Sequence, residues 1–277
     1  MGRAEPPRRL IVNADDFGRT PEINEAVAIA HRDGILTTAS LMVNEPAVQE
    51  AVTAARTLPG LGVGLHLALV CGGAAQSHAE APGLVDTAGQ LDPNPVRAGL
   101  RYFFIRGLRQ ELRAEIAAQF LRFEATGLPL DHINGHLNVH LHPVVFGLLL
   151  GSGQTTRPTG FRLTRDRFRL NARLARGNWP YRLSHAVIFG LLCARAAPEL
   201  RKTAWRHTDS VFGLLQNARV DEAFVLGLLE RLPPGDSELY SHPSLTDARH
   251  EFEALISPRV RAALKLHSIR LIRHQDL

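Results

Sequence analysis

Four histidines follow at short intervals in the stretch "DHINGHLNVHLHP", residues 131–143. The even positions from 132 to 142 are histidine or asparagine, whereas the odd positions from 133 are apolar or glycine. Because an extended chain sends alternate side chains to opposite faces, this pattern predicts a polar column backed by an apolar one. Imidazole groups in such a column are suited to binding a metal ion or to transferring protons.

Two further stretches place reactive side chains where a strand is expected to end. Asp15 and Asp16 are adjacent in "NADDFG", and His66 is the only polar side chain on its face of "GLGVGLHLAL". Adjacent carboxylates repel each other, which raises one pKa unless a cation or a proton lies between them. One carboxylate and two imidazoles would form a three-ligand site that leaves room for water and substrate. Zinc suits the imidazoles, whereas Mg²⁺ or Mn²⁺ accepts the carboxylate and extra waters.

Each feature also has an ordinary structural explanation. A lone pair of aspartates is commonly a solvated turn, and a lone histidine in a strand is commonly hydrogen-bonded in the core. The metal-site interpretation depends on all three stretches lying at strand ends. A fourth stretch, "ELYSHPS", places His242 at the end of the last expected strand, where it is a candidate general acid.

Short apolar runs alternate with helical patterns along the chain. The expected strands are 9–14, 37–44, 60–69, 129–136, 160–165 and 237–243. This alternation predicts βα units around a parallel sheet, whose active sites lie at the carboxyl ends of the strands. We expect helices at 21–33, capped by Thr20, and at about 109–126. The chain should leave the sheet near His136, and Pro143 should start the next helix.

The composition is that of a globular protein. Of 277 residues, 45% are hydrophobic and 21% charged, which predicts one large domain over 1–277, with a tail at about 1–8 and an insert or lid at about 71–100. Two cysteines cannot form a disulfide framework, so a reducing, cytoplasmic setting is expected. The net charge of +5 comes from dispersed arginines without an aromatic nucleic-acid signature, so no nucleic-acid partner is expected.

The segment "VRAGLRYFFIRGLRQELR" is both aromatic and basic. One interpretation is a helix that packs Leu100, Phe103, Phe104 and Leu108 on the barrel, and the other is a rim that meets a lipidic substrate or a membrane surface. The longest apolar run, 186–197, is interrupted by arginine and too short to span a bilayer, so we expect a soluble or peripheral protein. Residues 152–158 are expected to form a surface loop.

Taken together, the motifs resemble the YdjC-like carbohydrate deacetylase family over nearly the whole chain. They are "NADDFG" (13–18), "TTASLMVN" (37–44), "VGLHLAL" (63–69), "HINGHLNVHLHP" (132–143) and "LYSHP" (239–243). Within the family, the likeness is closest to the hopanoid biosynthesis-associated branch (HpnK), through residues 96–136 and "LISPRVRAAL".

The resemblance implies a distorted TIM-like (βα) barrel with one divalent metal ion, zinc or magnesium. The implied ligands are Asp16, His66 and His136, and Asp15 is the implied general base. The implied reaction removes the acetyl group from an N-acetylated amino sugar, which in the hopanoid branch is N-acetylglucosamine linked to a hopanoid lipid. Such a substrate would bring the protein to the inner membrane surface, and a homodimer is also considered.

The chain departs from the family pattern at several positions. Asn134 and Gly135 replace an aspartate and a serine of many relatives, and Asn138 replaces a common histidine. His140 or His142 therefore remains an alternative third ligand. The "FRLTRDRFRLN" stretch lacks the expected proline and glutamate, which leaves the substrate contacts open. Other functions considered are a chito-oligosaccharide deacetylase, a metal-dependent phosphoester hydrolase and a non-catalytic sugar- or lipid-binding protein.

Overall fold

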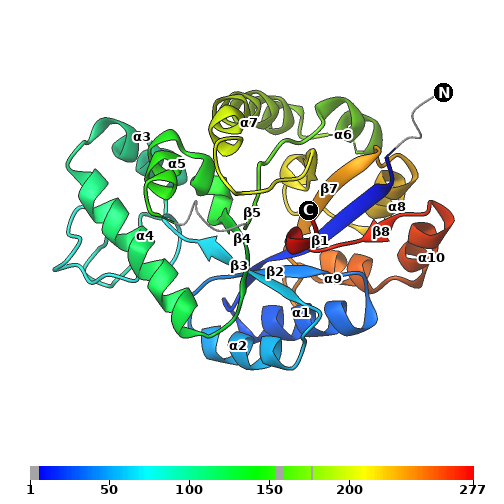
Figure 1. The fold of residues 1–277 in the computed structure, drawn as a ribbon, viewed down its shortest axis with the longest axis horizontal. Helices are drawn as coiled ribbons and strands as arrows, with labels where there is room; N and C mark the ends of the chain where they lie inside the picture. The colour runs from blue at the N-terminus through cyan, green and yellow to red at the C-terminus, as the bar shows by residue number, and fades with distance from the viewer. Residues whose placement is uncertain (1–5, 154–158, 176) are drawn as a thin grey trace.

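Strands and helices alternate along the chain in a computed structural model that describes residues 6–153, 159–175 and 177–277 (Figure 1). The strands are β1 (Arg8–Phe17), β2 (Thr38–Leu41), β3 (Gly62–Leu67), β4 (Leu130–Gly135), β5 (Gly160–Phe161), β6 (Ser210–Phe212), β7 (Gly235–Ser241) and β8 (Arg270–Leu271). The α-helices are α1 (Pro21–Asp33), α2 (Val48–Arg56), α3 (Pro95–Phe104), α4 (Leu108–Ala125), α5 (Pro143–Leu150), α6 (Phe168–Leu174), α7 (Trp179–Leu200), α8 (Glu222–Glu230), α9 (Arg249–Ile256) and α10 (Pro258–Leu266). Short 3₁₀ helices are η1 (His136–Leu141), η3 (Leu214–Gln216) and η4 (His274–Asp276).

The strands form a parallel sheet in the order β5-β4-β3-β2-β1-β7-β6, and β8 also pairs with β1. The sheet curls into a half-barrel with helices outside it, which confirms the predicted α/β fold with parallel strands. In Figure 1, α1, α2 and α9 lie on one side of the strands, and α3, α5 and α7 lie on the other. Parallel strands end at the same rim, so their carboxyl ends can supply one site together.

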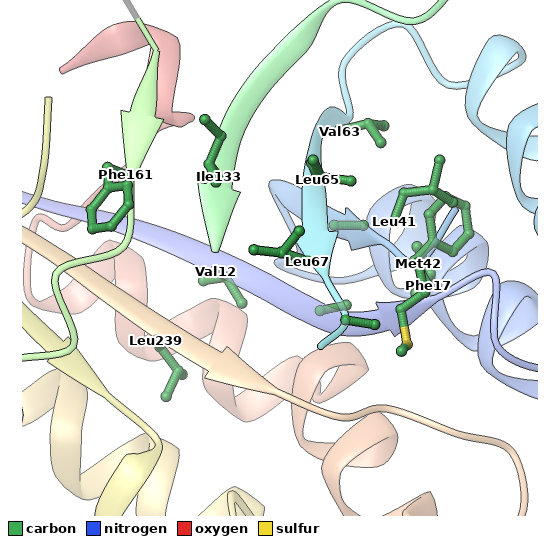
Figure 2. Packing of buried hydrophobic residues seen from close by; sticks show 14 of the residues in the cluster. Val12, Phe17, Leu41, Met42, Val63, Leu65, Leu67, Ile133, Phe161 and Leu239 are labelled. Carbon is green, nitrogen blue, oxygen red and sulfur yellow. The ribbon is translucent and has the colours of Figure 1, made fainter. Parts of the chain in front are cut away.

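Apolar side chains from neighbouring strands fill the core. Figure 2 shows Val12, Leu65, Ile133 and Leu239 among them, each fully buried and each from a different strand. Burial of apolar surface of this kind stabilises a fold by about 25 cal/mol per Å². The core therefore fixes the relative position of the strands whose ends carry the polar side chains.

Several predicted element boundaries are confirmed. The Thr20 hydroxyl accepts the Ile23 backbone N–H at 3.4 Å and caps α1, and Gly34 follows the helix. β4 ends at Gly135, so the chain leaves the sheet at His136 as predicted. Pro143 is the first residue of α5.

Other boundaries differ from the prediction. The strand expected at 160–165 pairs only over Gly160–Phe161, because it lies at the sheet edge and Arg162 turns into the interior. β6 and β8 were not predicted, since strands of three and two residues show no alternation. Of the expected tail, residues 1–5 lie outside the described residues, and the predicted loop at 152–158 lies mostly outside them.

The predicted packing of the aromatic and basic segment on the barrel is wrong for three of its four residues. Leu100 is 56% exposed, Phe103 50% and Phe104 71%, and only Leu108 is buried. Helix α3 instead buries a different face, which carries Tyr102 and Ala98. The Tyr102 hydroxyl donates to the Leu69 carbonyl at 2.5 Å, so a polar contact anchors the helix and leaves the three apolar side chains outside.

A cluster of buried polar side chains lies near the amino ends of the strands. Asp131 accepts a hydrogen bond from His132 Nδ1 at 2.9 Å and faces His274 Nδ1 at 3.2 Å. The two imidazoles stack with ring centroids 4.2 Å apart, and the Ser40 hydroxyl lies 2.8 Å from His132 Nε2. The ring of His132 occupies space that is free because residue 64 has no side chain.

We expect Gly64→Ala to destabilise the protein by about 1–3 kcal/mol. Its methyl group would lie 2.5 Å from ring atoms of His132, which cannot move without breaking two hydrogen bonds. Gly147→Ala in α5 is the matched control, because its methyl group meets open space. This substitution should raise the free energy of unfolding by about 0.5–1 kcal/mol. Urea unfolding of both variants measures the difference, and equal stabilities would contradict the tight packing at residue 64.

The proton on His274 should make stability depend on pH. Burial lowers the pKa of this imidazole, but Asp131 and Glu238 outweigh burial and raise it to about 9. Its contribution is therefore complete below pH 6.5, the ordinary value, and is lost as the pH rises through 9. His274→Gln should lose at most about 3 kcal/mol at pH 6, and the loss should shrink toward pH 10. Urea unfolding measures it, with surface His250→Gln as the control, and a loss independent of pH would refute the charged state.

Candidate metal centre

The backbone separates the two adjacent carboxylates at the end of β1. Asp16 has a left-handed φ of 62°, and the pairing of β1 with β2 shifts register between Ala14 and Phe17. A left-handed backbone is unfavourable for most residues other than glycine, although aspartate tolerates it better than most. Here it directs the carboxylates of Asp15 and Asp16 to different partners: the first meets a guanidinium, and the second meets two imidazoles.

Asp16, His66 and His136 come from the ends of three different strands and lie together. Asp16 Oδ1 is 3.0 Å from His136 Nδ1 and 3.3 Å from His66 Nε2. One ligand atom of each residue lies within 4.8 Å of the others, and all three residues are buried. The imidazoles meet edge to face, with ring centroids 5.7 Å apart. The chain also brings Arg19 to this point, since its guanidinium donates to Asp16 Oδ2 at 2.9 Å.

The hydrogen bonds of His66 determine which of its nitrogens is free. Its Nδ1 lies 2.7 Å from the side-chain oxygen of Asn134, an acceptor, so Nδ1 carries the proton. In the neutral ring, Nε2 then presents a lone pair toward Asp16, and this buried atom has no hydrogen-bond partner. A lone pair that faces a carboxylate is favourable when a cation lies between them. The three side chains therefore fit a divalent ion. In metal sites, a hydrogen bond at the other imidazole nitrogen, such as that of His66 Nδ1 to Asn134, commonly fixes the orientation of the ring.

Asp15 is held by a bidentate salt bridge. Arg162 donates from both terminal nitrogens to its two carboxylate oxygens, at 2.7 and 2.8 Å. Asn13 adds a hydrogen bond at 2.8 Å, and Asn134 adds a longer one at 3.3 Å. Burial raises the pKa of Asp15, but Arg162, His66 and His242 together hold it well below the ordinary range. The carboxylate is thus ionised at neutral pH.

Arg162 links the site to the polar cluster beneath it. Its Nε donates to Glu238 at 2.7 Å, and its guanidinium lies 4.3 Å above the ring of Tyr240. Burial raises the pKa of Glu238, but Arg162 and His274 lower it to about 2. The other oxygen of Glu238 lies 3.5 Å from His274 Nε2. Asp15, Arg162, Glu238 and His274 therefore form a row of alternating charges inside the half-barrel, each compensating its neighbour.

His242 lies at the mouth of the site. Its Nε2 is 4.0 Å from Asp15 Oδ2, and its side chain is 37% exposed. On its other side, Nδ1 lies 3.8 Å from Glu251, whose carboxylate also accepts the His242 backbone N–H at 2.6 Å. The imidazole of His242 is thus partly open to solvent while it lies near Asp15.

The remaining histidines of the 131–143 stretch have other partners. His140 Nε2 lies 2.8 Å from the Arg162 carbonyl, and burial lowers its pKa to about 3. His142 Nε2 lies 3.1 Å from the Gly99 carbonyl. Asn138, which replaces the histidine of many relatives, accepts the Thr164 hydroxyl at 2.8 Å. The group that surrounds Asp16 therefore contains neither His140 nor His142.

The sequence reasoning missed Arg162, Glu238 and His274. The first two had a recognisable signal: Arg162 alternates with apolar residues in "GFRLTR", and Glu238 shares its strand parity with Tyr240 and His242. A charged residue at an inward position of a strand needs a buried partner of opposite charge. His274 had no such signal, because it follows a two-residue strand in a polar tail.

Curated relatives align with about half to two thirds of the chain. A carbohydrate deacetylase of Brevibacillus brevis is 41% identical over 142 residues, which are 51% of this chain and 54% of the relative. One of Geobacillus stearothermophilus is 36% identical over 183 residues, 66% of each chain. A chitooligosaccharide deacetylase of Salmonella newport is 33% identical over 150 residues, 51% of this chain and 54% of the relative. The chain thus spans less than two thirds of the length of each of these relatives.

A solved structure from Enterococcus faecalis shares the fold over 98% of both chains, with a TM-score of 0.75 and 23% identity. At that identity the likeness concerns the fold alone. The family model described as "YdjC-like protein" matches residues 9–266, which include both aspartates and every histidine placed at the site. With this match over most of its length, the chain belongs to the YdjC-like protein family.

Proposed function

We propose that this protein is a metal-dependent amidohydrolase that removes the acetyl group from an N-acetylated amino sugar. The observation that carries the proposal is the unpartnered lone pair of His66 Nε2, which faces Asp16 at 3.3 Å beside His136. Asp16, His66 and His136 would hold one divalent ion, zinc or magnesium. When bound, such an ion polarises a carbonyl group and makes water more acidic.

Asp15 is the proposed general base. Its carboxylate is ionised, buried and fixed by Arg162, so it can accept the proton of an attacking water without moving. The ion pair makes this carboxylate a weak base, which is adequate only for a water whose acidity is already raised. His242 is the proposed general acid, since its exposed imidazole near Asp15 can donate a proton to the departing sugar nitrogen.

The names of the curated relatives support an N-acetylated carbohydrate as substrate. We propose further that the sugar is N-acetylglucosamine linked to a hopanoid lipid. The motifs shared with the hopanoid branch and the exposed apolar side chains of α3 support this finer assignment. The enzyme would then be cytoplasmic and peripheral at the inner membrane surface. A chito-oligosaccharide is the second candidate, favoured by the name of the Salmonella relative.

Substitution of the proposed ligands should weaken the binding of a divalent ion. Asp16→Asn and His136→Gln should weaken the binding of Zn²⁺ by at least about tenfold, because each removes one of three ligands. His140→Gln is the matched control and should bind the ion as the unmodified protein does, since His140 bonds to the Arg162 carbonyl instead. Calorimetric titration of protein first treated with chelator measures the affinities. Loss of binding in His140→Gln with retention in His136→Gln would reverse the ligand assignment.

Asp15→Asn should lower kcat for acetate release by about 10²–10⁴-fold, because the amide cannot take the proton. The assay uses an N-acetylglucosamine-bearing hopanoid and a chitin disaccharide, each with and without chelator. The variant should still bind Zn²⁺, which separates loss of the base from loss of the site.

Two outcomes of this assay would contradict the proposals. Release of phosphate from phosphoesters without release of acetate would overturn the amidohydrolase. Equal acetate release from both sugars would remove the hopanoid preference and leave the carbohydrate deacetylase in place.

A further inference from the structure

Exposed apolar side chains gather on two helices of the described structure. Of thirteen large hydrophobic residues that are exposed there, five lie at 96–105 and five at 179–191. The first five are Val96, Leu100, Phe103, Phe104 and Ile105, and the second five are Trp179, Leu183, Val187, Ile188 and Leu191. A soluble protein scatters such residues singly, whereas an apolar group on one surface indicates a binding face.

Both helices belong to the rim that carries the metal centre. Helix α3 lies in the connection that follows β3, and α7 lies in the one that follows β5. Helix α3 contacts α5, and both α5 and α7 contact η1, the turn that begins with His136. In Figure 1, α3, α5 and α7 lie on the same side of the strands. Leu137 of η1, 50% exposed, adds an apolar side chain beside the ligand.

The segments that carry these apolar side chains are rich in arginine, and the acidic residue of helix α7, Glu199, lies at the end of the helix and pairs with Lys202. Residues 96–110 include four arginines and residues 167–198 include six, with neither aspartate nor glutamate in either segment. Six of these arginines are exposed and form no ion pair with a described residue: Arg106, Arg109, Arg167, Arg169, Arg173 and Arg195. Apolar side chains beside unpaired cations are typical of a protein surface that binds a membrane with anionic lipids.

We propose that α3 and α7 form a docking face that holds this protein on an anionic lipid surface, with the metal centre at the docked rim. A second copy of the chain is the less favourable occupant, because a symmetric contact would bring the same arginines against each other. Docking itself does not depend on the enzyme activity. Only its purpose, the delivery of a lipid-linked sugar to the site, rests on the proposed function.

Helix α7 would lie along the surface rather than cross it. Among the described residues, α7 is the helix whose length and composition would permit it to cross a membrane. It is longer than the apolar run at 186–197 that was noted in the sequence. However, Cys193, Ala196 and Leu200 are buried in the core, and Arg182 donates to the carbonyls of Leu215 and Ala175. These contacts keep one face of the helix on the protein and leave the other for lipid.

Vesicle sedimentation tests the docking face with the full chain. The protein should bind vesicles of phosphatidylcholine with about 30 mol% phosphatidylglycerol at least tenfold more tightly than vesicles of phosphatidylcholine alone. Raising the salt to about 0.5 M should remove most of the difference, because it screens the arginines. Equal binding to both vesicles, or no binding to either, would overturn the proposal.

Substitutions should assign the binding to the face. The triple variant Leu183→Gln, Val187→Gln and Leu191→Gln should bind anionic vesicles at least tenfold more weakly. Leu121→Gln with Leu266→Gln is the matched control, since both leucines are exposed on other helices and should not affect binding. If the triple variant binds as the control does, α7 is not part of the face. If light scattering shows a dimer that the triple variant disrupts, a second copy covers the face and the lipid proposal fails.

The same variants keep the two proposals separate. The triple variant should release acetate from a soluble chitin disaccharide at the unmodified rate, because none of its residues contacts the metal centre. Vesicle binding without any acetate release would contradict the proposed function but would still support the docking face.

Discussion

Neutralisation of buried charge is the constraint on which the structure of this site depends. Asp15 and Asp16 are adjacent and almost wholly buried, and two such carboxylates repel strongly in a low-dielectric interior. The left-handed backbone of Asp16 resolves the conflict by directing the two carboxylates to different partners. Arg162 takes Asp15, while two imidazoles face Asp16. The proposed base and the proposed metal ligand thus differ in partner although they are neighbours in sequence.

Local patterns in the sequence predicted the frame of the molecule well. Apolar runs and alternation identified β1, β3 and β4, the proline and glycine signals located both ends of α1, and Pro143 located the start of α5. Of the predicted polar column, His132 and Asn134 lie in β4, whereas from His136 the chain turns into η1 and the parity of an extended strand no longer applies. The structure brings His136 to Asp16 across 120 residues of chain. The strands and the helix ends could be predicted because each depends on a pattern that a single segment displays on its own.

Features that depend on distant partners could not be predicted in the same way. Arg162 lies 147 residues from Asp15 and 76 from Glu238, and no local pattern relates them. For a similar reason, the sequence left open whether Phe103 and Phe104 pack on the barrel or lie exposed: an apolar stripe shows which face of a helix is apolar, but not what that face contacts. The order of the strands in the sheet determines which strand ends lie side by side. The short strands β6 and β8 are part of that order, and they were not predicted.

The polar cluster beneath the site contains the same kinds of side chain as the candidate metal centre above it. Asp131, His132 and His274 also lie close enough together to share an ion. There, however, His132 bonds to Ser40, and Asp131 and Glu238 raise the pKa of His274 to about 9, so at neutral pH a proton occupies the place that a metal ion would need. At neutral pH, one equivalent of divalent ion should therefore saturate the chain. In alkaline buffer, where His274 loses its proton, a second equivalent of divalent ion could bind at Asp131, His132 and His274. That binding would result from the high pH and would not be related to catalysis.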